Sequence, residues 1–177
     1  KEHPETQLVV GIHAETSAGT IHPIDEFARL AHEAGALFMT DVVTSLAGCE
    51  LEFDKWDIDF AYSGSQKCLA APPGISPVAM SERALDYIRN RPKPPSSWYL
   101  DLSLIADYWA PDHIPHHTAP VSMIYGLREA VGMVLNETLE TRWKRHEANA
   151  VALRAGLSAL NLELPISESE RLDQLTI

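Results

Sequence analysis

Cysteine is scarce in this sequence, and long apolar runs are missing. Only Cys49 and Cys68 occur, without CxxC spacing, which excludes a disulfide framework and favours a reducing compartment. No apolar run approaches the ~18 residues that a membrane span needs, and no basic start followed by an apolar region marks a signal peptide. We therefore expect a soluble protein of the cytoplasm or an organelle, without membrane contact.

Basic residues are also few. The chain has 14 lysines and arginines against 25 aspartates and glutamates, a formal net charge of −11. Such a charge argues against nucleic acids and anionic membrane surfaces as partners. The rest of the composition is ordinary for a globular protein, with 45% apolar and 22% charged residues. A chain of 177 residues is long enough for one good-sized core.

The two ends do not read as those of a complete protein. The chain opens on KEHPETQ without a methionine and enters the strand-like LVVGIHA almost at once. It closes on RLDQLTI, which reads as a strand that has just begun. We therefore expect an internal fragment of a longer protein.

The first half of the chain predicts an α/β fold. Apolar, β-branched or alternating runs predict four strands, at residues 8–13, 36–43, 57–64 and 77–81. Between the first two strands, residues 24–34 predict a helix with Ile24, Phe27, Leu30, Ala31 and Ala34 on its apolar face. Strand, helix and strand at this spacing form a βαβ unit, so the sheet is expected to be at least partly parallel.

The second half predicts helices after a stiff RPKPP connector. A short helix is expected at DLSLIADYW, followed by the irregular loop APDHIPHHTAP. Two longer helices are expected at residues 121–136 and 139–160, the second with leucines such as Leu153 and Leu160 on a packing stripe. We expect residues 1–137 to belong to a large domain and residues 138–177 to begin a smaller one.

Three polar clusters follow the predicted strands. His13 to Ser17 follow the first strand, Asp41 ends the second, and Ser63 to Lys67 follow the third. Ligands of open parallel sheets bind beyond the carboxyl ends of the strands, so these clusters are expected on one rim. A lysine there can form a Schiff base with the aldehyde of pyridoxal phosphate, whose ring nitrogen needs a carboxylate partner such as Asp41. Taken alone, a lysine such as Lys67 is more often an incidental loop cation, and an aspartate such as Asp41 is more often a turn or cap residue.

Four motifs carry a family resemblance. HAETSAG, TDVVTSLAG, YSGSQKCLAAPPG and HHTAPV, in this order and spacing, resemble the class V aminotransferases, most closely the alanine–glyoxylate and serine–pyruvate group. The resemblance implies a fold-type I pyridoxal phosphate enzyme, with a mostly parallel sheet flanked by helices. It also implies a homodimer whose active sites lie at the dimer interface.

The resemblance also implies roles for individual residues. Lys67 would form the internal aldimine with pyridoxal 5′-phosphate, and Asp41 would pair with the pyridine nitrogen. Val43 would pack against one face of the ring. Gln66 would lie by the phosphate, and Thr16 close to the oxygen side of the ring.

Thr118, in HHTAP, would reach the phosphate of the cofactor in the partner subunit. One position departs from the family pattern: Pro115 stands where a tyrosine usually makes a second contact with that phosphate. The Gly-rich phosphate loop and the ring-stacking aromatic are expected before residue 1, and the arginine for the substrate carboxylate after residue 177. No metal is expected, because the histidines of the same loop lack a carboxylate or thiolate at helical spacing.

The resemblance implies transamination between a small amino acid, alanine or serine, and a 2-oxo acid, glyoxylate or pyruvate. Pyridoxamine–pyruvate and phosphonate-type transamination remain alternatives among pyridoxal phosphate reactions. Cysteine desulfuration is disfavoured, because that group uses a histidine near its lysine and a separate loop cysteine. A non-catalytic fragment that keeps the fold is an alternative of another class, and the presence of both Lys67 and Asp41 argues against it.

Overall fold

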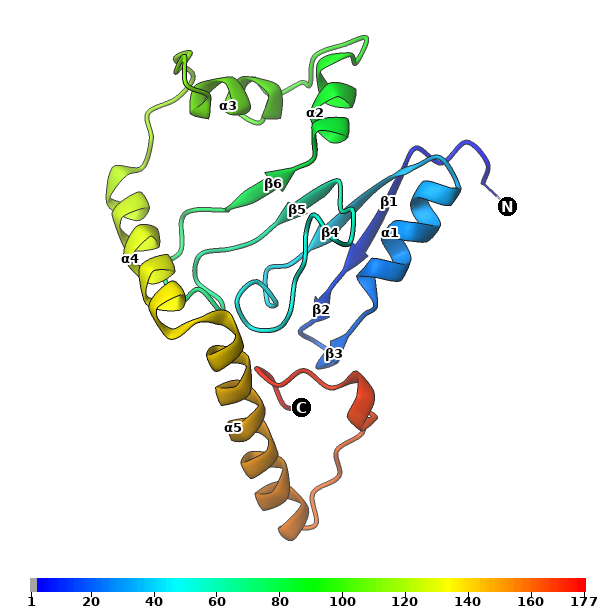
Figure 1. The fold of residues 1–177 in the computed structure, drawn as a ribbon, viewed down its shortest axis with the longest axis vertical. Coiled ribbons are helices and arrows are strands. Elements are labelled where there is room, and N and C mark those ends of the chain that lie inside the picture. Colours follow the sequence, from blue (N-terminus) through cyan, green and yellow to red (C-terminus); the bar gives the residue numbers. More distant parts are fainter. Residues whose placement is uncertain (1–2) are drawn as a thin grey trace.

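The computed structural model describes residues 3–177, in which helices are arranged around a central sheet (Figure 1). The strands are β1 (Leu8–Ile12), β2 (Ala14–Glu15), β3 (Thr20–Ile21), β4 (Leu37–Asp41), β5 (Phe60–Tyr62) and β6 (Val78–Met80). The helices are α1 (Ile24–Glu33), α2 (Glu82–Arg89), α3 (Leu102–Trp109), α4 (Val121–Glu137), α5 (Leu139–Ala159) and a 3₁₀ turn at Glu168–Glu170.

The main sheet has the order β1-β4-β5-β6. β1 pairs with β4 and β4 pairs with β5 in parallel, whereas β6 runs antiparallel to β5. The four predicted strands and the partly parallel sheet are therefore confirmed. The small hairpin of β2 and β3 falls in a segment expected to be a loop. Strands of two residues are too short to leave an alternating pattern in the sequence.

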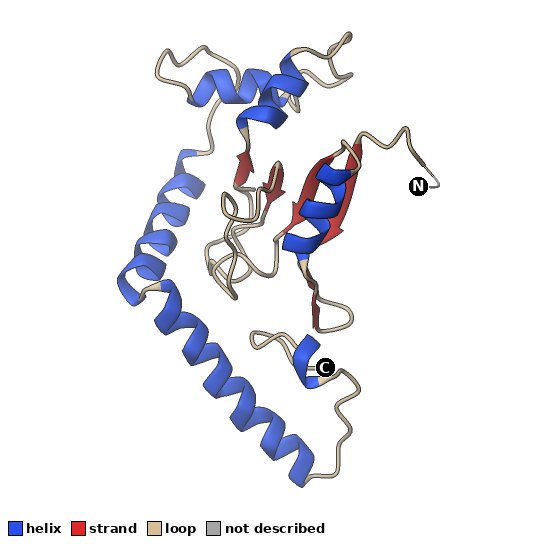
Figure 2. Ribbon diagram, turned by 45° about the vertical axis from the view of Figure 1, so that its right-hand side comes forward, coloured by secondary structure: helices blue, strands red, loops and turns tan. Residues whose placement is uncertain are grey.

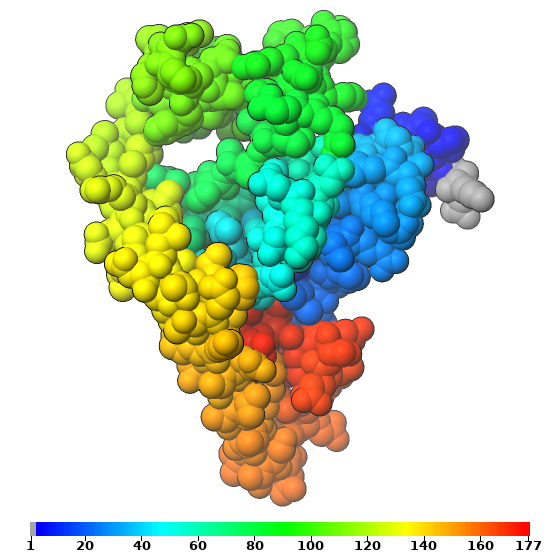
Figure 3. All heavy atoms as spheres, in the orientation of Figure 1, coloured from blue at the N-terminus to red at the C-terminus, as the bar shows by residue number. Residues whose placement is uncertain are grey.

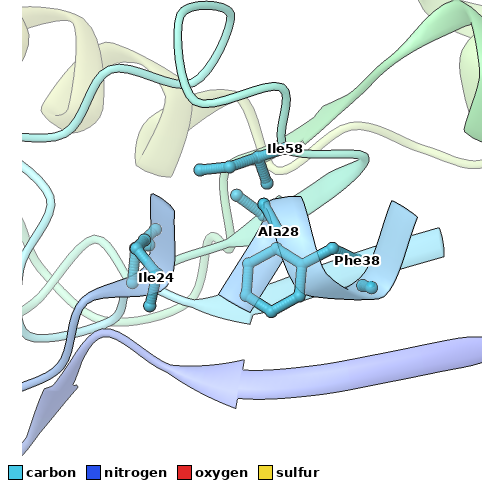
Figure 4. Packing of buried hydrophobic residues seen from close by; sticks show 7 residues of the cluster. Ile24, Ala28, Phe38 and Ile58 are labelled. Carbon is cyan, nitrogen blue, oxygen red and sulfur yellow. The ribbon is translucent and has the colours of Figure 1, made fainter. Parts of the chain in front are cut away.

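The core lies between α1 and the sheet, where Ile24, Ala28, Phe38 and Ile58 pack together (Figure 4). The expected face of α1 is corrected at two positions. Leu30 is 48% exposed and Ala34 is an exposed C-cap residue, whereas Ala28 is buried instead. Residues 24, 28 and 31 follow the steps of four and three that keep one face of a helix toward the core. Figure 2 shows α1 lying across the face of the β1–β4 pair.

A buried carboxylate ties several elements together at the amino-terminal end of the parallel strands. Asp59, which is 1% exposed, precedes β5. It accepts hydrogen bonds from Phe38 N at 2.8 Å, Ser81 Oγ at 2.9 Å and Arg83 Nε at 2.7 Å, and lies 2.8 Å from His32 Nε2. We call these five residues the Asp59 cluster. It joins α1, β4, β5 and the start of α2 on the rim opposite the polar loops.

Helix α2 was not expected from the sequence, although a start signal precedes it. The Ser81 side chain accepts a hydrogen bond from Ala84 N and caps the helix, as serine often does at this position. The helix has eight residues, of which only Ala84 is buried.

Helices α4 and α5 are separated by one residue, Thr138, with a φ of 67°. The break coincides with the expected domain boundary at residue 137, which stays a prediction. The expected packing stripe of α5 is wrong at its far end, because Leu153 is 52% and Leu160 is 71% exposed. Within the described residues 3–177, no helix is both long and apolar enough to cross a membrane.

The last residues fold back onto the hairpin rather than starting a strand. An isolated bridge joins Arg171 to Thr20, and Leu172 is buried at 1% exposure. Arg154 of α5 donates to the Leu172 carbonyl. Figure 3 shows these residues packed between α5 and the region of the hairpin. The expected strand at RLDQLTI is therefore wrong, because the segment finds one bridge and side-chain contacts instead of a ladder.

Candidate active site

The carboxylate of Asp41 is held by two donors. Asp41 ends β4 and pairs in register with Tyr62, which ends β5. Val43 N donates to Asp41 Oδ1 at 2.8 Å, and Tyr62 OH donates to Asp41 Oδ2 at 2.8 Å. The hydrogen bond to Asp41 raises the pKa of the Tyr62 phenol, and burial of the phenol contributes in the same direction to a smaller extent. Both oxygens of the carboxylate are thus fixed at the carboxyl end of the sheet.

The turn that carries Lys67 is shaped by two buried serines. Ser63 Oγ donates to the Val42 carbonyl at 3.2 Å, and Ser65 Oγ donates to the Pro72 carbonyl at 2.6 Å. Lys67 itself is exposed on this turn. Among residues 3–177, no carboxylate lies within 4.0 Å of its amine. The amine is therefore free to meet a ligand, while the backbone beneath it is fixed.

Thr44 connects the three polar loops. Thr16 Oγ1 donates to Thr44 Oγ1 at 3.2 Å, and Thr44 Oγ1 donates to the Ala14 carbonyl at 2.8 Å. The Thr44 carbonyl accepts from Cys68 Sγ at 3.3 Å and from Gln174 Nε2 at 2.9 Å. The loops after β1, β4 and β5 therefore meet on one rim, as the strand order predicts. Thr44 was not singled out from the sequence, although it lies within the TDVVTS motif.

Helix α5 braces the Lys67 turn from behind. Arg142 Nη2 donates to the Cys68 carbonyl at 2.5 Å, and Arg142 Nη1 donates to Glu137 Oε2 at 3.0 Å. In the sequence, Arg142 is one of several charged residues on the helix surface, and no local signal marks this contact. Burial raises the pKa of the Cys68 thiol, and a thiol with a raised pKa is a poor nucleophile at neutral pH.

His13 is the first residue after β1. It is 2% exposed, and its ring lies edge-on to that of Trp56 at 5.9 Å. Its Nδ1 atom is buried without a hydrogen-bond partner among the described residues. Burial, and then the charge of His22, lowers the pKa of His13 to about 4, so the ring is neutral at physiological pH.

The remaining expected site residues are not joined to Asp41 by hydrogen bonds within residues 3–177. Gln66 is exposed beside Lys67, and its Oε1 folds over Gly64, where an added Cβ would lie 2.8 Å from it. Thr118 is exposed on the segment that joins α3 to α4, as is Pro115 (Figure 1). The sheet positions Thr16, Asp41, Val43 and Lys67 on one rim, whereas Thr118 lies on a separate segment.

The histidines of that segment belong to an aromatic cluster. The His116 ring lies 4.1 Å from the Trp98 ring, and His116 Nε2 is 3.0 Å from the Trp98 carbonyl. His117 packs against Tyr108 at 4.8 Å, and the two histidine Nδ1 atoms are 2.9 Å apart. The histidines therefore shape the loop that carries Thr118.

Two relatives are similar over most of the chain. The (S)-ureidoglycine–glyoxylate transaminase of Bacillus subtilis is 40% identical over an alignment 176 residues long, and the match covers 89% of this chain and 42% of the relative. The alanine–glyoxylate aminotransferase of Callithrix jacchus is 41% identical over 159 residues, which cover 88% of this chain and 38% of the relative. The chain thus spans about two fifths of the length of these relatives.

Solved structures are similar at the level of the fold. The B. subtilis ureidoglycine–glyoxylate aminotransferase superposes with a TM-score of 0.92 and 41% identity, covering 97% of this chain and 45% of the other. The pyridoxamine–pyruvate aminotransferase of Mesorhizobium loti superposes with a TM-score of 0.87 and 35% identity, covering 97% and 44%. These likenesses show the fold-type I architecture expected from the sequence.

The family model described as aminotransferase class-V matches residues 2–175, nearly the whole chain. Pyridoxal 5′-phosphate is the cofactor of that family. The motifs, the sheet order and the rim that gathers them agree with this match, and the chain belongs to the class V aminotransferases.

Proposed function

We propose that the full-length protein is a pyridoxal phosphate-dependent aminotransferase. It would transfer an amino group between a small amino acid, alanine or serine, and a 2-oxo acid, glyoxylate or pyruvate. The observation that carries the proposal is the arrangement of Asp41, which two donors fix on the same rim as the turn bearing the unpaired amine of Lys67.

The residues present fit pyridoxal phosphate. An amine without a carboxylate partner can bind an aldehyde, which a salt-bridged ammonium does less readily. The Asp41 carboxylate has about four lone-pair sites, two of which accept bonds from Val43 and Tyr62, so it can accept another donor from a ring nitrogen. The Thr16 hydroxyl lies on the same rim through its bond to Thr44.

When bound, the cofactor supplies an electron sink for the carbanion that forms at the α-carbon of the substrate. Lys67 would hold the cofactor through its amine and, once displaced by the substrate amino group, move a proton from the substrate α-carbon. Asp41 would accept a hydrogen bond from the ring N–H, and this bond would keep the proton on the ring nitrogen. Thr16 would bind the ring oxygen and Val43 would pack against the ring face.

The phosphate contacts are proposed to come from both subunits of a homodimer. Gln66 would contact the phosphate within its own subunit, and its position next to Lys67 supports this. Thr118 would contact the phosphate of the neighbouring site, and its exposure on a segment apart from the rim agrees with a role across an interface.

The amino donor is the least constrained part of the proposal. The relatives named for (S)-ureidoglycine and for alanine are similarly identical to this chain, at 40% and 41%, so (S)-ureidoglycine is a second candidate donor with glyoxylate as acceptor. Pyridoxamine with pyruvate is a further candidate, supported by the M. loti structure. Phosphonate-type transamination and a non-catalytic fold are the remaining alternatives.

The test is donor profiling of the purified full-length protein with alanine, serine, (S)-ureidoglycine and pyridoxamine, each with glyoxylate or pyruvate. Borohydride reduction followed by peptide mapping should place the cofactor label on Lys67. Lys67→Ala should abolish labelling and turnover, whereas the exposed control Lys55→Ala should keep both, since Lys55 lies 3.8 Å from Glu52 and away from the rim. A label on another lysine would remove Lys67 from the mechanism, and absence of turnover with every pair would favour the non-catalytic alternative.

A further inference from the structure

Tyr62 is placed by the sheet to act on Asp41. The two residues end neighbouring parallel strands and are direct partners in the register. Side chains at paired positions project from the same face of a sheet, so the phenol runs alongside the carboxylate. The resulting hydrogen bond, from Tyr62 OH to Asp41 Oδ2 at 2.8 Å, links residues 21 positions apart in the chain.

We infer that Tyr62 is a positioning residue, which keeps the Asp41 carboxylate oriented toward the cofactor ring nitrogen. The inference rests on the proposed function, because the cofactor ring nitrogen is the group that Asp41 is proposed to bind. The contact between Tyr62 and Asp41 is observed in the structure and does not depend on that proposal. Val43 N secures Oδ1 and Tyr62 secures Oδ2, so the plane of the carboxylate is set before any ligand binds. A carboxylate held by a single donor is free to turn about its last bond.

The contact acts on the cofactor ring through the orientation of Asp41. A carboxylate whose two oxygens are both held can keep a free lone pair pointed at the ring N–H. The proton on the ring nitrogen is needed for electron withdrawal, so this orientation bears on the chemical step. Loss of the phenol hydroxyl should therefore affect turnover more than substrate binding.

The charge that acts on the phenol comes from one side. Asp41, on β4, is the acidic group that faces Tyr62, and it raises the pKa of the phenol through their hydrogen bond. On the other side, β6 presents Val78 at the position paired with Tyr62, and valine does not titrate. The phenol therefore remains protonated, and a donor, throughout the neutral range.

The first test uses the cofactor-free protein. Tyrosinate absorbance is titrated in wild type and in Asp41→Asn, in which the charge is lost and the side-chain shape is kept. The inference requires one tyrosine to ionise at lower pH in Asp41→Asn. Coincident titrations of the two proteins would overturn it. This comparison is independent of any catalytic activity and of the folding of a Tyr62 variant.

The second test uses the cofactor-loaded protein. Tyr62→Phe should lower kcat about tenfold, equivalent to about 1.4 kcal/mol, with KM within about twofold and a changed absorption spectrum of the bound cofactor. Tyr87→Phe is the matched control. It also removes a tyrosine hydroxyl that donates to a side chain, since Tyr87 OH on α2 donates to Gln7 Oε1 at 2.7 Å. Unchanged kcat and spectrum in Tyr62→Phe would overturn the inference.

The two tests also separate this inference from the proposed function. A wild-type protein that neither binds pyridoxal phosphate nor transaminates would end the proposed function. The tyrosinate titration would still decide whether Tyr62 and Asp41 act on each other in the folded protein. A wild-type enzyme that is active while both Tyr62 tests are negative would end the inference alone.

Discussion

Replacement of Asp59 by asparagine should destabilise the protein far more than the same change at Asp57. Both carboxylates lie beside the same two side chains, those of Arg83 and His32. Arg83 Nε is 2.7 Å from Asp59 and Arg83 Nη2 is 3.2 Å from Asp57, while the His32 ring nitrogens lie 2.8 Å and 3.1 Å from them. The two positions differ in exposure, which is 1% for the Asp59 side chain and 65% for that of Asp57.

The magnitude follows from what asparagine can no longer do. Bonds to a charged group are worth about 1.5–3 kcal/mol against about 0.5–1.5 for neutral ones, and Asp59 accepts from Arg83, His32, Phe38 N and Ser81. The amide nitrogen of asparagine is a donor and accepts no hydrogen bond, so the donors that now bond to one oxygen of Asp59 would lose their acceptor. Since Arg83 is 47% exposed, we discount the full loss for a buried pair and expect about 2–4 kcal/mol for Asp59→Asn. Asp57→Asn should lose less than about 1 kcal/mol.

The acid limb of stability gives a second signature. Burial alone would raise the pKa of Asp59, but the hydrogen bonds from Arg83, Phe38 N, His32 and Ser81 outweigh it and lower the pKa below 3.8. A carboxyl with a lowered folded pKa contributes stability above the unfolded pKa and loses it as the pH falls through the folded value. Wild type should therefore lose this contribution below about pH 4, and Asp59→Asn should lack that part of the decline.

The assay is urea unfolding of the cofactor-free proteins at neutral and acid pH. The free energies of unfolding are compared between variants whose m-values, the slopes of free energy against urea concentration, are the same. Cofactor-free protein is used so that binding does not contribute to the apparent stability. Equal losses in Asp59→Asn and Asp57→Asn would refute the reasoning, because burial would then have no influence on the value of the contacts.

Three further predictions concern the rim and its surroundings. Asp41→Asn should keep the fold and lower turnover about ten- to hundredfold or more, and turnover within twofold of wild type would contradict this. Thr118→Ala should weaken cofactor binding and Pro115→Tyr should tighten it, measured as cofactor Kd. In mixed dimers of Thr118→Ala and Lys67→Ala chains, the one site that keeps its lysine should behave as wild type. Burial lowers the pKa of His13 from 6.5 to about 4, so between these pH values the unfolded chain binds a proton that the folded protein excludes. The free energy of unfolding should therefore fall by about 3 kcal/mol as the pH is lowered from 6.5 to about 4. Urea midpoints of wild type and His13→Gln across this pH range test it, and parallel curves would contradict it.

Several features of the fold were predictable because their signals are local. Helix α1 begins after Pro23 and ends before Gly35, and both residues act through their own backbone preferences. The strands that form β1 and β4 are apolar runs of a length typical of strands. The motif around Lys67 is contiguous, so its order and content indicated the family before any contact was known.

The details of the site were not predictable, since they join residues far apart in the chain. The Tyr62–Asp41 bond spans 21 residues, the Thr16–Thr44 bond 28, and the bond from Arg142 to the Cys68 carbonyl 74. A tyrosine at the end of a strand, or an arginine on a helix surface, carries no local mark of its partner.

The sequence alone therefore determined the four strands of the main sheet, most of the helices, the rim on which the polar loops meet, and the family. Apolar periodicity and turn residues act over a few positions and need no knowledge of the partner. Only the tertiary structure decided that Tyr62 holds Asp41, that Thr44 joins the loops, and that Asp59 is buried. Those outcomes depend on strand register and on which helix covers which face, because hydrogen bonds require donor and acceptor within about 3 Å.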